Sequence, residues 1–499
     1  MPPPAFDRTR PYPRLGPALL LLGIALALRI WDFGNPVIHV DEQYYLLVGD
    51  RMLHGAVPYI DIWDRKPIGL FLLFAALRLR PGDGILAYQI AATFAAAATA
   101  IIVHHSAALL GARPRGALAA GAVYLIGLSL LGGHGGQSPV FYNLLMTGAA
   151  LLTLRLPILL RDGRSMIGNG VTACLLAGVA IQMKYTPAVE GMVFGMAHLW
   201  YLHRAGTRLT GLAGAAIVLA LAGLLPSLAA IGWYAAQGHA ALAAFWFANF
   251  TSIALRSGYP ADQIAMRLLG IVAQLSPLII CAAFTWRRHP RGGAGGAVHR
   301  LGFGWLAAAV IGFLAIGTFF DHYALPLVAP LAILAAPMLG RSPRALIATL
   351  GLGLTLFMVE RGFARGDRDG ARALATVVAA NSADGCPYVF IGDTITYLLA
   401  RTCLPTVYAF PNLLAYDTER GATGIDEAAE VRRILATRPP VIVTSDRRLS
   451  IWNAASLHAV KAMLASHYRP VFTTPRAGWN NVVYLRNDRP FRTSPPARR

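Results

Sequence analysis

The chain has 499 residues, of which 56% are hydrophobic and 14% are charged. A soluble globular protein carries about 25% charged residues, so this composition excludes a soluble fold and predicts a polytopic membrane protein. The net charge is +20. No basic stripe interleaved with aromatic residues accompanies this charge, so we expect no nucleic-acid binding and assign the basic residues to cytoplasmic loops that orient the helices.

Eleven apolar segments each approach the length of about 20 residues that a helix needs to span a membrane. They cover residues 15–31, 85–110, 116–131, 139–157, 168–183, 186–202, 209–233, 266–286, 301–319, 323–339 and 344–359. A shorter apolar segment at 67–80 either crosses the membrane or forms a half-buried or re-entrant helix. The sequence therefore predicts about 11–13 transmembrane helices.

Basic residues gather in four short segments, at 155–164, 203–208, 286–300 and 340–344. Such segments usually face the cytoplasm. Counting the spans between them places the loop at 32–66, the turn at 132–138, the loop at 234–265 and the C-terminal part together on the extracytoplasmic side. We expect any site built from these segments to lie there.

The sequence pattern changes after residue 360, where apolar runs typical of strands alternate with runs typical of helices. This predicts a small extracytoplasmic α/β domain over 361–499, after a transmembrane domain over 1–360. No glycine-rich loop follows a strand there, so we predict no nucleotide site. Cys386 and Cys403 lie in this part and could pair if it is extracytoplasmic, whereas Cys174 and Cys281 lie in apolar spans and are expected to pack there.

The first loop contains the stretch "HVDEQYYLLVGDRMLHGAVPYIDIWDRKP", residues 39–67. Its start predicts an interfacial helix from Asp41 to Leu53, with Tyr44 on the apolar face at headgroup depth. Asp41 would lie near the positive end of the helix dipole, which favours an ionised carboxylate. That carboxylate could take a proton from an incoming hydroxyl, or it could simply cap the helix.

The end of this stretch, "DIWDRKP", places acids and bases at one membrane depth. Pro67 is typical of the first turn of a helix, which leaves Arg65 and Lys66 at the level of lipid phosphates. A basic membrane anchor would explain these two cations, but it would not explain Asp61 and Asp64. The mixture indicates a site that holds both an anion and a hydroxylated group.

Three later stretches add candidates for binding a sugar or a phosphate. Lys184 is one of only three lysines, with Lys66 and Lys461, and it follows an apolar span. The other candidates lie in "GGHGGQSPVFYN" (132–143) and "FFDHYALPLVAP" (319–330): Gln137, Asn143, His322 and Tyr323. The alternatives are a tight interhelical turn for the first stretch, a snorkelling side chain for Lys184, and an interfacial anchor for the last.

These residues carry a resemblance to polytopic glycosyltransferases of the GT-C fold. The chain looks closest to the family of the protein O-mannosyltransferases and the lipid A aminoarabinose transferase. The shared marks are the acidic pair "DE" followed by tyrosine, "D-x-K-P" at the start of the next helix, and the stretch "FFDHYALPLVAP". The resemblance covers residues 1–360 in detail and the C-terminal domain only in architecture.

The resemblance implies a cell-membrane transferase that moves a sugar from a polyprenyl phosphate to an acceptor hydroxyl on a lipid, polysaccharide or protein. Asp41, with Glu42 beside it, matches the catalytic acid that acts as general base. Lys66 matches the lysine that contacts the lipid phosphate, with Arg65 and Lys184 as further phosphate ligands. Tyr44 stands where some relatives carry a basic residue.

The resemblance also bears on cofactors. Asp64 matches an acidic position that holds a metal in some relatives, so a divalent metal is an open expectation, and no other cofactor is implied. Two other classes of protein remain as alternatives. One is a lipid or small-solute transporter, which the absence of repeats and the clustering of polar residues at one surface disfavour. The other is a non-catalytic protein that binds a cell-envelope polymer, for which Asp41 would be dispensable.

Overall fold

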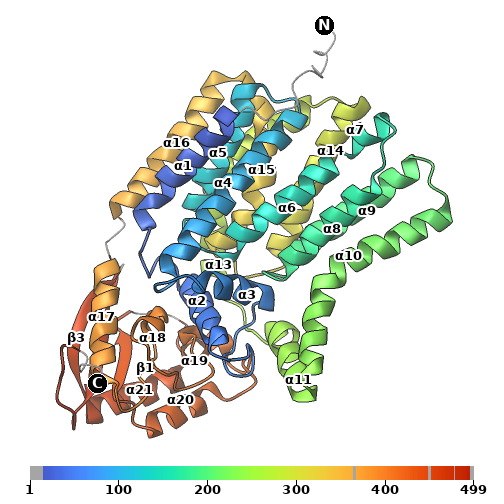
Figure 1. Cartoon of the computed structure of the whole chain (residues 1–499). Coiled ribbons are helices and arrows are strands. Elements are labelled where there is room, and N and C mark those ends of the chain that lie inside the picture. The colour runs from blue at the N-terminus through green and yellow to red at the C-terminus, as the bar shows by residue number, and fades with distance from the viewer. Residues whose placement is uncertain (1–14, 364–366, 448–450, 477, 495–499) are drawn as a thin grey trace.

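A computed structural model describes residues 15–363, 367–447, 451–476 and 478–494. It shows a bundle of long helices with an α/β region against one end, at the lower left in Figure 1. The first described residues lie at the opposite end of the bundle (Figure 1). The predicted class, a helical polytopic membrane protein with a small C-terminal α/β part, is confirmed.

In the described residues, eight helical segments are long and apolar enough to cross a membrane. They are α1 (Leu15–Arg29), α4 (Ile85–Leu109), α6 (Ser138–Leu154) with α7 (Leu156–Arg161), α10 (Leu209–Ala236), α13 (Ala261–Arg288), α14 (Gly293–Leu314), α15 (Leu325–Arg341) and α16 (Pro343–Phe363). Three further helices belong to the same bundle: α5 (Pro114–Leu130), α8 (Ile167–Ile181) and α9 (Pro187–Arg204). Together they match the eleven segments expected from the sequence.

The ambiguous apolar run after Pro67 forms α3 (Ile68–Arg78), which has 11 residues. At 1.5 Å per residue it extends about 16 Å, roughly half of the hydrocarbon thickness of a bilayer. This helix is therefore too short to cross alone. It lies at the lower end of the bundle in Figure 1, next to the C-terminal region.

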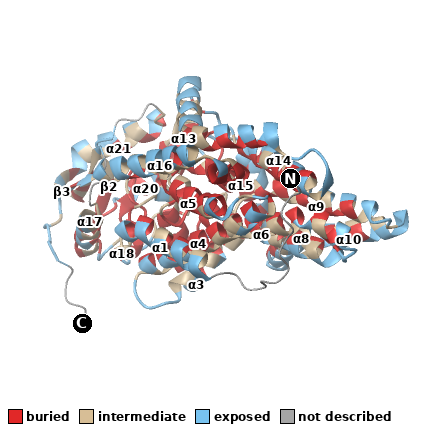
Figure 2. Cartoon of the chain, turned by 90° about the horizontal axis from the view of Figure 1, so that it is seen from above, coloured by how far each residue is buried: buried red, intermediate tan, exposed pale blue. Residues whose placement is uncertain are grey.

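Many residues on the outside of the bundle are exposed (Figure 2), and large apolar side chains are among them, which agrees with a lipid surround. In α15, 89% of the most apolar window is buried inside the protein, so this helix forms the centre of the bundle. In α10 and α16 the buried shares are 17% and 11%. Large apolar side chains exposed along such helices would be unfavourable in water but are favourable in contact with lipid tails.

The C-terminal region contains a four-stranded sheet in the order β1-β2-β4-β3. Its strands are β1 (Tyr388–Val389), β2 (Val441–Ser445), β3 (Tyr468–Arg476) and β4 (Trp479–Arg486). Strand β1 pairs in parallel with β2, while the other pairs are antiparallel. The sheet is accompanied by α17 (Arg368–Asn381), α18 (Ile395–Leu399), α19 (Pro411–Ala415), η4 (Asp417–Glu419), α20 (Glu427–Ala436) and α21 (Ala454–His467).

Strand β3 is absent from the sequence prediction, and its two prolines explain why. Pro470 and Pro475 cannot donate a backbone hydrogen bond, so a strand that holds them is tolerated mainly at the edge of a sheet. Strand β3 has this edge position. Cys386 and Cys403 form a disulfide in the same region, whereas Cys174 and Cys281 are free and buried in the bundle.

The first loop folds into η1 (Ile30–Asp32) and α2 (Val40–Leu53), so the helix predicted from Asp41 to Leu53 is present. Tyr44 and Tyr45 are each only 1% exposed because α2 packs against α3 and against α18 of the C-terminal region. Gln43 donates a hydrogen bond of 2.9 Å to Asp393, which lies 350 residues later. The expected headgroup position of Tyr44 is therefore wrong, since the C-terminal region covers this helix instead of lipid.

The loop after α10 is also folded, as α11 (His239–Trp246), the π-helix η2 (Phe247–Thr251) and α12 (Ser252–Ala254). Ser252 donates a hydrogen bond of 2.5 Å to the carbonyl of Ala422. The C-terminal region is thus held by both the first loop and this later one. A short 3-10 turn, η3 (Asp321–Ala324), precedes α15 at the same end of the bundle.

Candidate active site

A cavity of about 830 Å³ lies where the bundle meets the C-terminal region. The start of α2, the ends of several bundle helices and residues 410–419 of the C-terminal region all line it. Its volume is within the range of about 300–1,000 Å³ that is typical of ligand sites. Seven predicted site residues line this one cavity: Asp41, Asp64, Arg65, Lys66, Lys184, His322 and Tyr323.

Asp41 occupies the first turn of α2, whose N-cap is His39. The Nδ1 atom of His39 accepts a hydrogen bond of 3.3 Å from the backbone N–H of Asp41. The Asp41 Oδ2 atom lies 3.5 Å from His322 Nε2 and 3.4 Å from Gln137 Nε2. Burial would raise the pKa of Asp41, but Lys66, His39 and His322 outweigh it, so this pKa is lowered and the carboxylate is ionised at neutral pH.

Lys66 precedes α3 and interacts electrostatically with both Asp41 and Asp64. Its Nζ atom lies 5.5 Å from the centre of the Tyr45 ring. Burial disfavours the ammonium, but Tyr45 and the two carboxylates outweigh it and raise the pKa of Lys66 well above its usual value. Burial raises the pKa of Asp64, whose Oδ1 atom accepts a 2.6 Å hydrogen bond from the backbone of Arg65.

Lys184 lies between α8 and α9 and faces the same cavity. Its Nζ atom lies 3.9 Å from the centre of the Tyr323 ring, which is a cation–π contact. Burial, reinforced by the charge of Lys66, lowers the pKa of Lys184 to about 7. Among the described residues no carboxylate forms an ion pair with it. Within the described residues, the ammonium of Lys184 thus faces the cavity without an ion-paired carboxylate.

Three side chains around Asp41 could hold a metal ion. One ligand atom each from His39, Asp41 and His322 lie within 4.8 Å of one another. Two imidazoles and a carboxylate suit Zn²⁺ and other divalent transition metals. The Nε2 atom of His322 is buried, lies 3.5 Å from Asp41 Oδ2 and makes no hydrogen bond within the described residues, so an ion between the two atoms would supply its missing partner. Asp64, for which the family resemblance implies a metal, is not in this group.

Four predicted site residues are not members of the described cavity lining: Glu42, Tyr44, Gln137 and Asn143. Glu42 is fully buried and accepts a hydrogen bond from the backbone N–H of Gly136. Burial raises the pKa of Glu42 to about 8. Glu42 therefore fixes α2 against the glycine-rich turn at 132–137, to which Arg29 also donates a hydrogen bond at the Gly133 carbonyl.

The other three residues have contacts that suit support of the structure. Tyr44 donates a 2.8 Å hydrogen bond to the carbonyl of Trp63, which follows α2. Asn143 donates a 3.2 Å hydrogen bond to the carbonyl of Leu325 and so links α6 to α15. Gln137 contacts both Asp41 and His39, which makes it a positioning residue for the carboxylate. A direct contact of these residues with substrate stays a prediction.

An ion-pair cluster connects the first loop to the C-terminal region across the cavity. Arg65 Nη1 lies 2.6 Å from Glu419 Oε2, and Arg256 Nη2 lies 2.8 Å from Glu419 Oε1. The sequence offers no signal for Glu419, because it lies in a region without a recognisable motif. Arg267 is also absent from the sequence prediction, although an arginine just inside a predicted span is a signal that could have found it.

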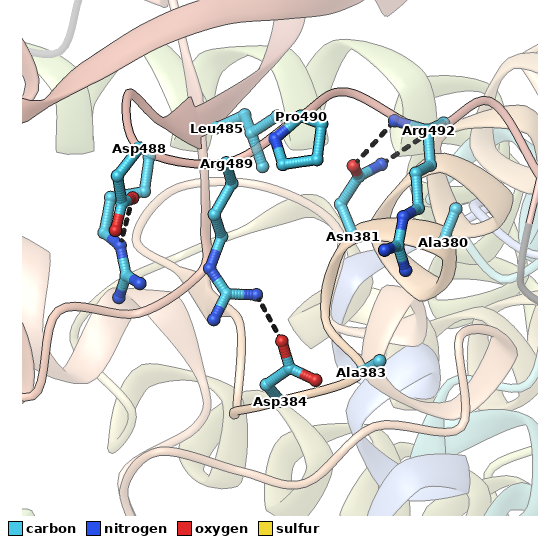
Figure 3. A pocket seen from close by; sticks show the side chains of 10 residues that line it. Ala380, Asn381, Ala383, Asp384, Leu485, Asp488, Arg489, Pro490 and Arg492 are labelled. Atoms are coloured by element: carbon cyan, nitrogen blue, oxygen red, sulfur yellow. Dashed lines mark hydrogen bonds and ion pairs between the residues drawn. The ribbon is translucent and has the colours of Figure 1, made fainter.

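A second, smaller pocket of about 270 Å³ lies in the C-terminal region (Figure 3). Four of its five charged side chains form two ion pairs, and Arg492 is the fifth. Arg489 forms a 2.9 Å ion pair with Asp384, and Arg486 forms a 2.7 Å ion pair with Asp488. Paired surface charges of this kind give no reason to place chemistry here.

The chain thus has a helical bundle, a C-terminal region that covers the first loop, and a charged cavity between them. Its fold is similar to the GT-C fold of solved membrane glycosyltransferases. No protein-family model matches the sequence, and no curated protein is similar to it in sequence. The similarity is therefore one of fold.

Two solved structures illustrate it. ArnT from Cupriavidus metallidurans bound to undecaprenyl phosphate has a TM-score of 0.60 and 13% identity, over 95% of this chain and 98% of that one. The Archaeoglobus fulgidus oligosaccharyltransferase tethered with an acceptor peptide has a TM-score of 0.54 and 11% identity, over 94% of this chain and 73% of that one. The expected resemblance to GT-C glycosyltransferases is confirmed.

Proposed function

We propose that this protein is a membrane glycosyltransferase that moves a sugar from a polyprenyl-phosphate-linked donor to an acceptor hydroxyl. The observation that carries the proposal is the cavity in which an ionised Asp41 and a protonated Lys66 face the same space. The solved GT-C structures with undecaprenyl phosphate or dolichol phosphate support a lipid-phosphate donor.

Asp41 and Lys66 act on different substrates, the acceptor and the donor. The acceptor oxygen forms a bond to the anomeric carbon as the bond from that carbon to the phosphate oxygen breaks, and the bonding electrons leave with the lipid phosphate. Asp41 takes the acceptor proton as general base. Lys66 and Lys184 stabilise the phosphate that leaves.

A divalent ion held by His39, Asp41 and His322 would add a positive charge that stabilises a bound oxygen anion. The proposal does not depend on it, because Lys66 and Lys184 already face the cavity. The acceptor would enter between the bundle, which holds the donor, and the C-terminal region, which lines the cavity with Phe410, Asn412 and Tyr416.

We place the site on the extracytoplasmic face of the cytoplasmic membrane. The disulfide between Cys386 and Cys403 supports this side, because disulfides persist in oxidising compartments. The basic segments at 155–164, 203–208 and 340–344 lie at the other ends of the bundle helices, as positive cytoplasmic loops would. The lipid carrier would then be reached from within the same membrane.

The test is the Asp41→Asn variant, purified in detergent and supplied with radiolabelled polyprenyl-phosphate sugars and a membrane acceptor extract. Loss of a general base should lower transfer by about 10²–10⁴-fold, with folding and donor binding retained. Asp61→Asn is the matched control, since Asp61 is exposed in the same loop and does not line the cavity. Near-normal transfer by Asp41→Asn would remove Asp41 from the mechanism and favour a non-catalytic polymer-binding protein.

A second variant separates donor from acceptor. Lys66→Ala should weaken donor binding more than acceptor binding, because Lys66 is assigned to the donor phosphate. Lys461→Ala, at an exposed position on α21, is the control for loss of a lysine. Equal weakening of both substrates would assign Lys66 a general structural role.

A further inference from the structure

The segment that leads into α2 is held from two sides by parts of the chain that are far apart in the sequence. On the side of the bundle, Gln89 of α4 donates a 2.8 Å hydrogen bond to the carbonyl of Asn35. On the other side, Arg476, the last residue of β3, donates a 2.8 Å hydrogen bond to the carbonyl of Val37. Val37 lies two residues before His39, the N-cap of α2. The start of this helix is thus fixed between the bundle and the C-terminal region.

Asp393 organises the contact on the side of the C-terminal region. Its side chain is only 7% exposed and accepts hydrogen bonds of 2.9 Å from Gln43 of α2, Arg476 and Asn481. Arg476 also pairs with Asp367, the N-cap residue of α17. A buried carboxylate is unfavourable unless charged or polar groups satisfy its oxygens. These bonds therefore fix Asp393 and Arg476 relative to each other and to α2.

The segment that carries Asp393 is itself constrained. It lies between Cys386 and Cys403, which form a disulfide, and it includes α18, which packs against α2. Towards the other end of α2, Arg51 donates a 2.5 Å hydrogen bond to the carbonyl of Thr402 in the same disulfide-closed segment. The C-terminal region thus contacts α2 at both ends through one cross-linked segment.

Asp41 and Gln43 point to different sides of α2. At about 100° per residue, side chains two positions apart point about 200° apart around a helix. Asp41 lines the cavity, whereas Gln43 is buried against the C-terminal region. The bond at Gln43 therefore sets the rotation of the helix, and the bond at the Val37 carbonyl sets where it starts. Arg476 is also close enough to His39 to interact with it electrostatically.

We propose that Arg476 and Asp393 are positioning residues for the Asp41 carboxylate. Neither is a member of the described cavity lining, and together they fix the start and the rotation of the helix that carries Asp41. This rests on the proposed function, in which Asp41 is the general base. A general base acts only within hydrogen-bond reach of the proton, and a displacement of about 1 Å lowers a rate by about 10²-fold. The C-terminal region thereby sets the rate of transfer as well as lining the cavity.

The experiment compares full-length variants purified in detergent, with a radiolabelled polyprenyl-phosphate sugar as donor and the same membrane acceptor extract. The amount of donor bound per protein, the donor KM and the maximum rate of transfer are measured. We expect Arg476→Gln to lower the maximum rate by about 10–100-fold, with donor binding and donor KM within about twofold of wild type. A purely structural role would instead lower the fraction of protein that binds donor.

Arg469→Gln is the matched control. Arg469 is a half-buried arginine near the other end of β3, and it also donates hydrogen bonds to backbone carbonyls, all within the C-terminal region. Its maximum rate should stay within about twofold of wild type. If Arg476→Gln binds no donor, Gln43→Leu replaces it, because this variant removes the bond from α2 to Asp393 and leaves the ion pairs intact. It should lower the maximum rate about threefold or more.

A double-mutant cycle separates positioning from a general structural effect. In an Asp41→Asn background no carboxylate is left to position, so Arg476→Gln should change the residual rate by less than about twofold. An equal loss in both backgrounds would overturn the proposal. It would also be overturned if Arg476→Gln, or Gln43→Leu in its place, had the same maximum rate as Arg469→Gln. Unchanged transfer by Asp41→Asn alone would instead overturn the proposed function.

Discussion

Lys184 gives the sharpest test of the proposed binding of a lipid-phosphate donor in the cavity. Burial and the nearby Lys66 lower the pKa of Lys184 to about 7, so its charge changes within the physiological range. The ratio of charged to neutral lysine changes tenfold for each pH unit. About nine-tenths of the Lys184 side chains are therefore charged at pH 6 and about one-tenth at pH 8. The pKa of Lys66 is raised, so Lys66 stays charged across the same range.

The sign of the effect follows from the lowered pKa. The ammonium of Lys184 is present below about pH 7 and is lost above it, so donor binding that needs this charge weakens as the pH rises. If only the charged form binds, the affinity falls up to about tenfold between pH 6 and pH 8. Lys184→Arg should remove this dependence because a guanidinium does not deprotonate in this range.

The measurement is the dissociation constant of a polyprenyl-phosphate sugar at several pH values between 6 and 9. A glycosyl phosphodiester carries one constant negative charge there, so any slope belongs to the protein. The difference between wild type and Lys184→Arg isolates Lys184 from other titrating groups. Identical pH profiles for the two proteins would refute the assignment of Lys184 to the donor phosphate.

Three further predictions concern stability and metal binding. Gly135→Ala places a methyl group against the Glu42 carboxylate and should destabilise the protein by about 1–3 kcal/mol, measured as a lower Tm. Gly16→Ala is the control, because Gly16 has open space around it and its substitution should leave the Tm unchanged. Serine at both Cys386 and Cys403 removes a cross-link over 17 residues and should cost roughly 3 kcal/mol; an unchanged Tm would contradict this. His322→Ala removes one of three candidate metal ligands. The amount of zinc that the protein retains after dialysis, measured by mass spectrometry, should therefore fall to background. Retention equal to wild type would exclude His39, Asp41 and His322 as a zinc site.

Much of the bundle could be predicted because apolar length is a strong signal in a membrane. The segment predicted at 85–110 is helix 85–109 in the structure, and that at 209–233 is helix 209–236. The largest difference is at α14, which begins at Gly293 inside a predicted loop. Glycine weakens a helix in water, but here neighbouring helices bury Val298 and His299 and so extend it.

The cavity was predictable where polar side chains lie close to an apolar segment. Asp41, Lys66 and Lys184 each adjoin a span, and the structure brings all three to one cavity. Glu419 and His39 could not be found in this way. A glutamate in a polar region and a histidine at a helix start are common. Only the packing of distant segments brings Glu419 to Arg65, and His39 to Gln137 and His322.

The covered position of α2 has a consequence for how the protein is made. Gln43 and Asp393 are separated by 350 residues, yet their hydrogen bond helps to close the C-terminal region over the helix that carries Asp41. During synthesis this helix emerges early and has no cover until the last part of the chain has been made and folded. The cavity is therefore completed last, and a ribosome-bound or truncated chain holds the helical bundle without an enclosed cavity.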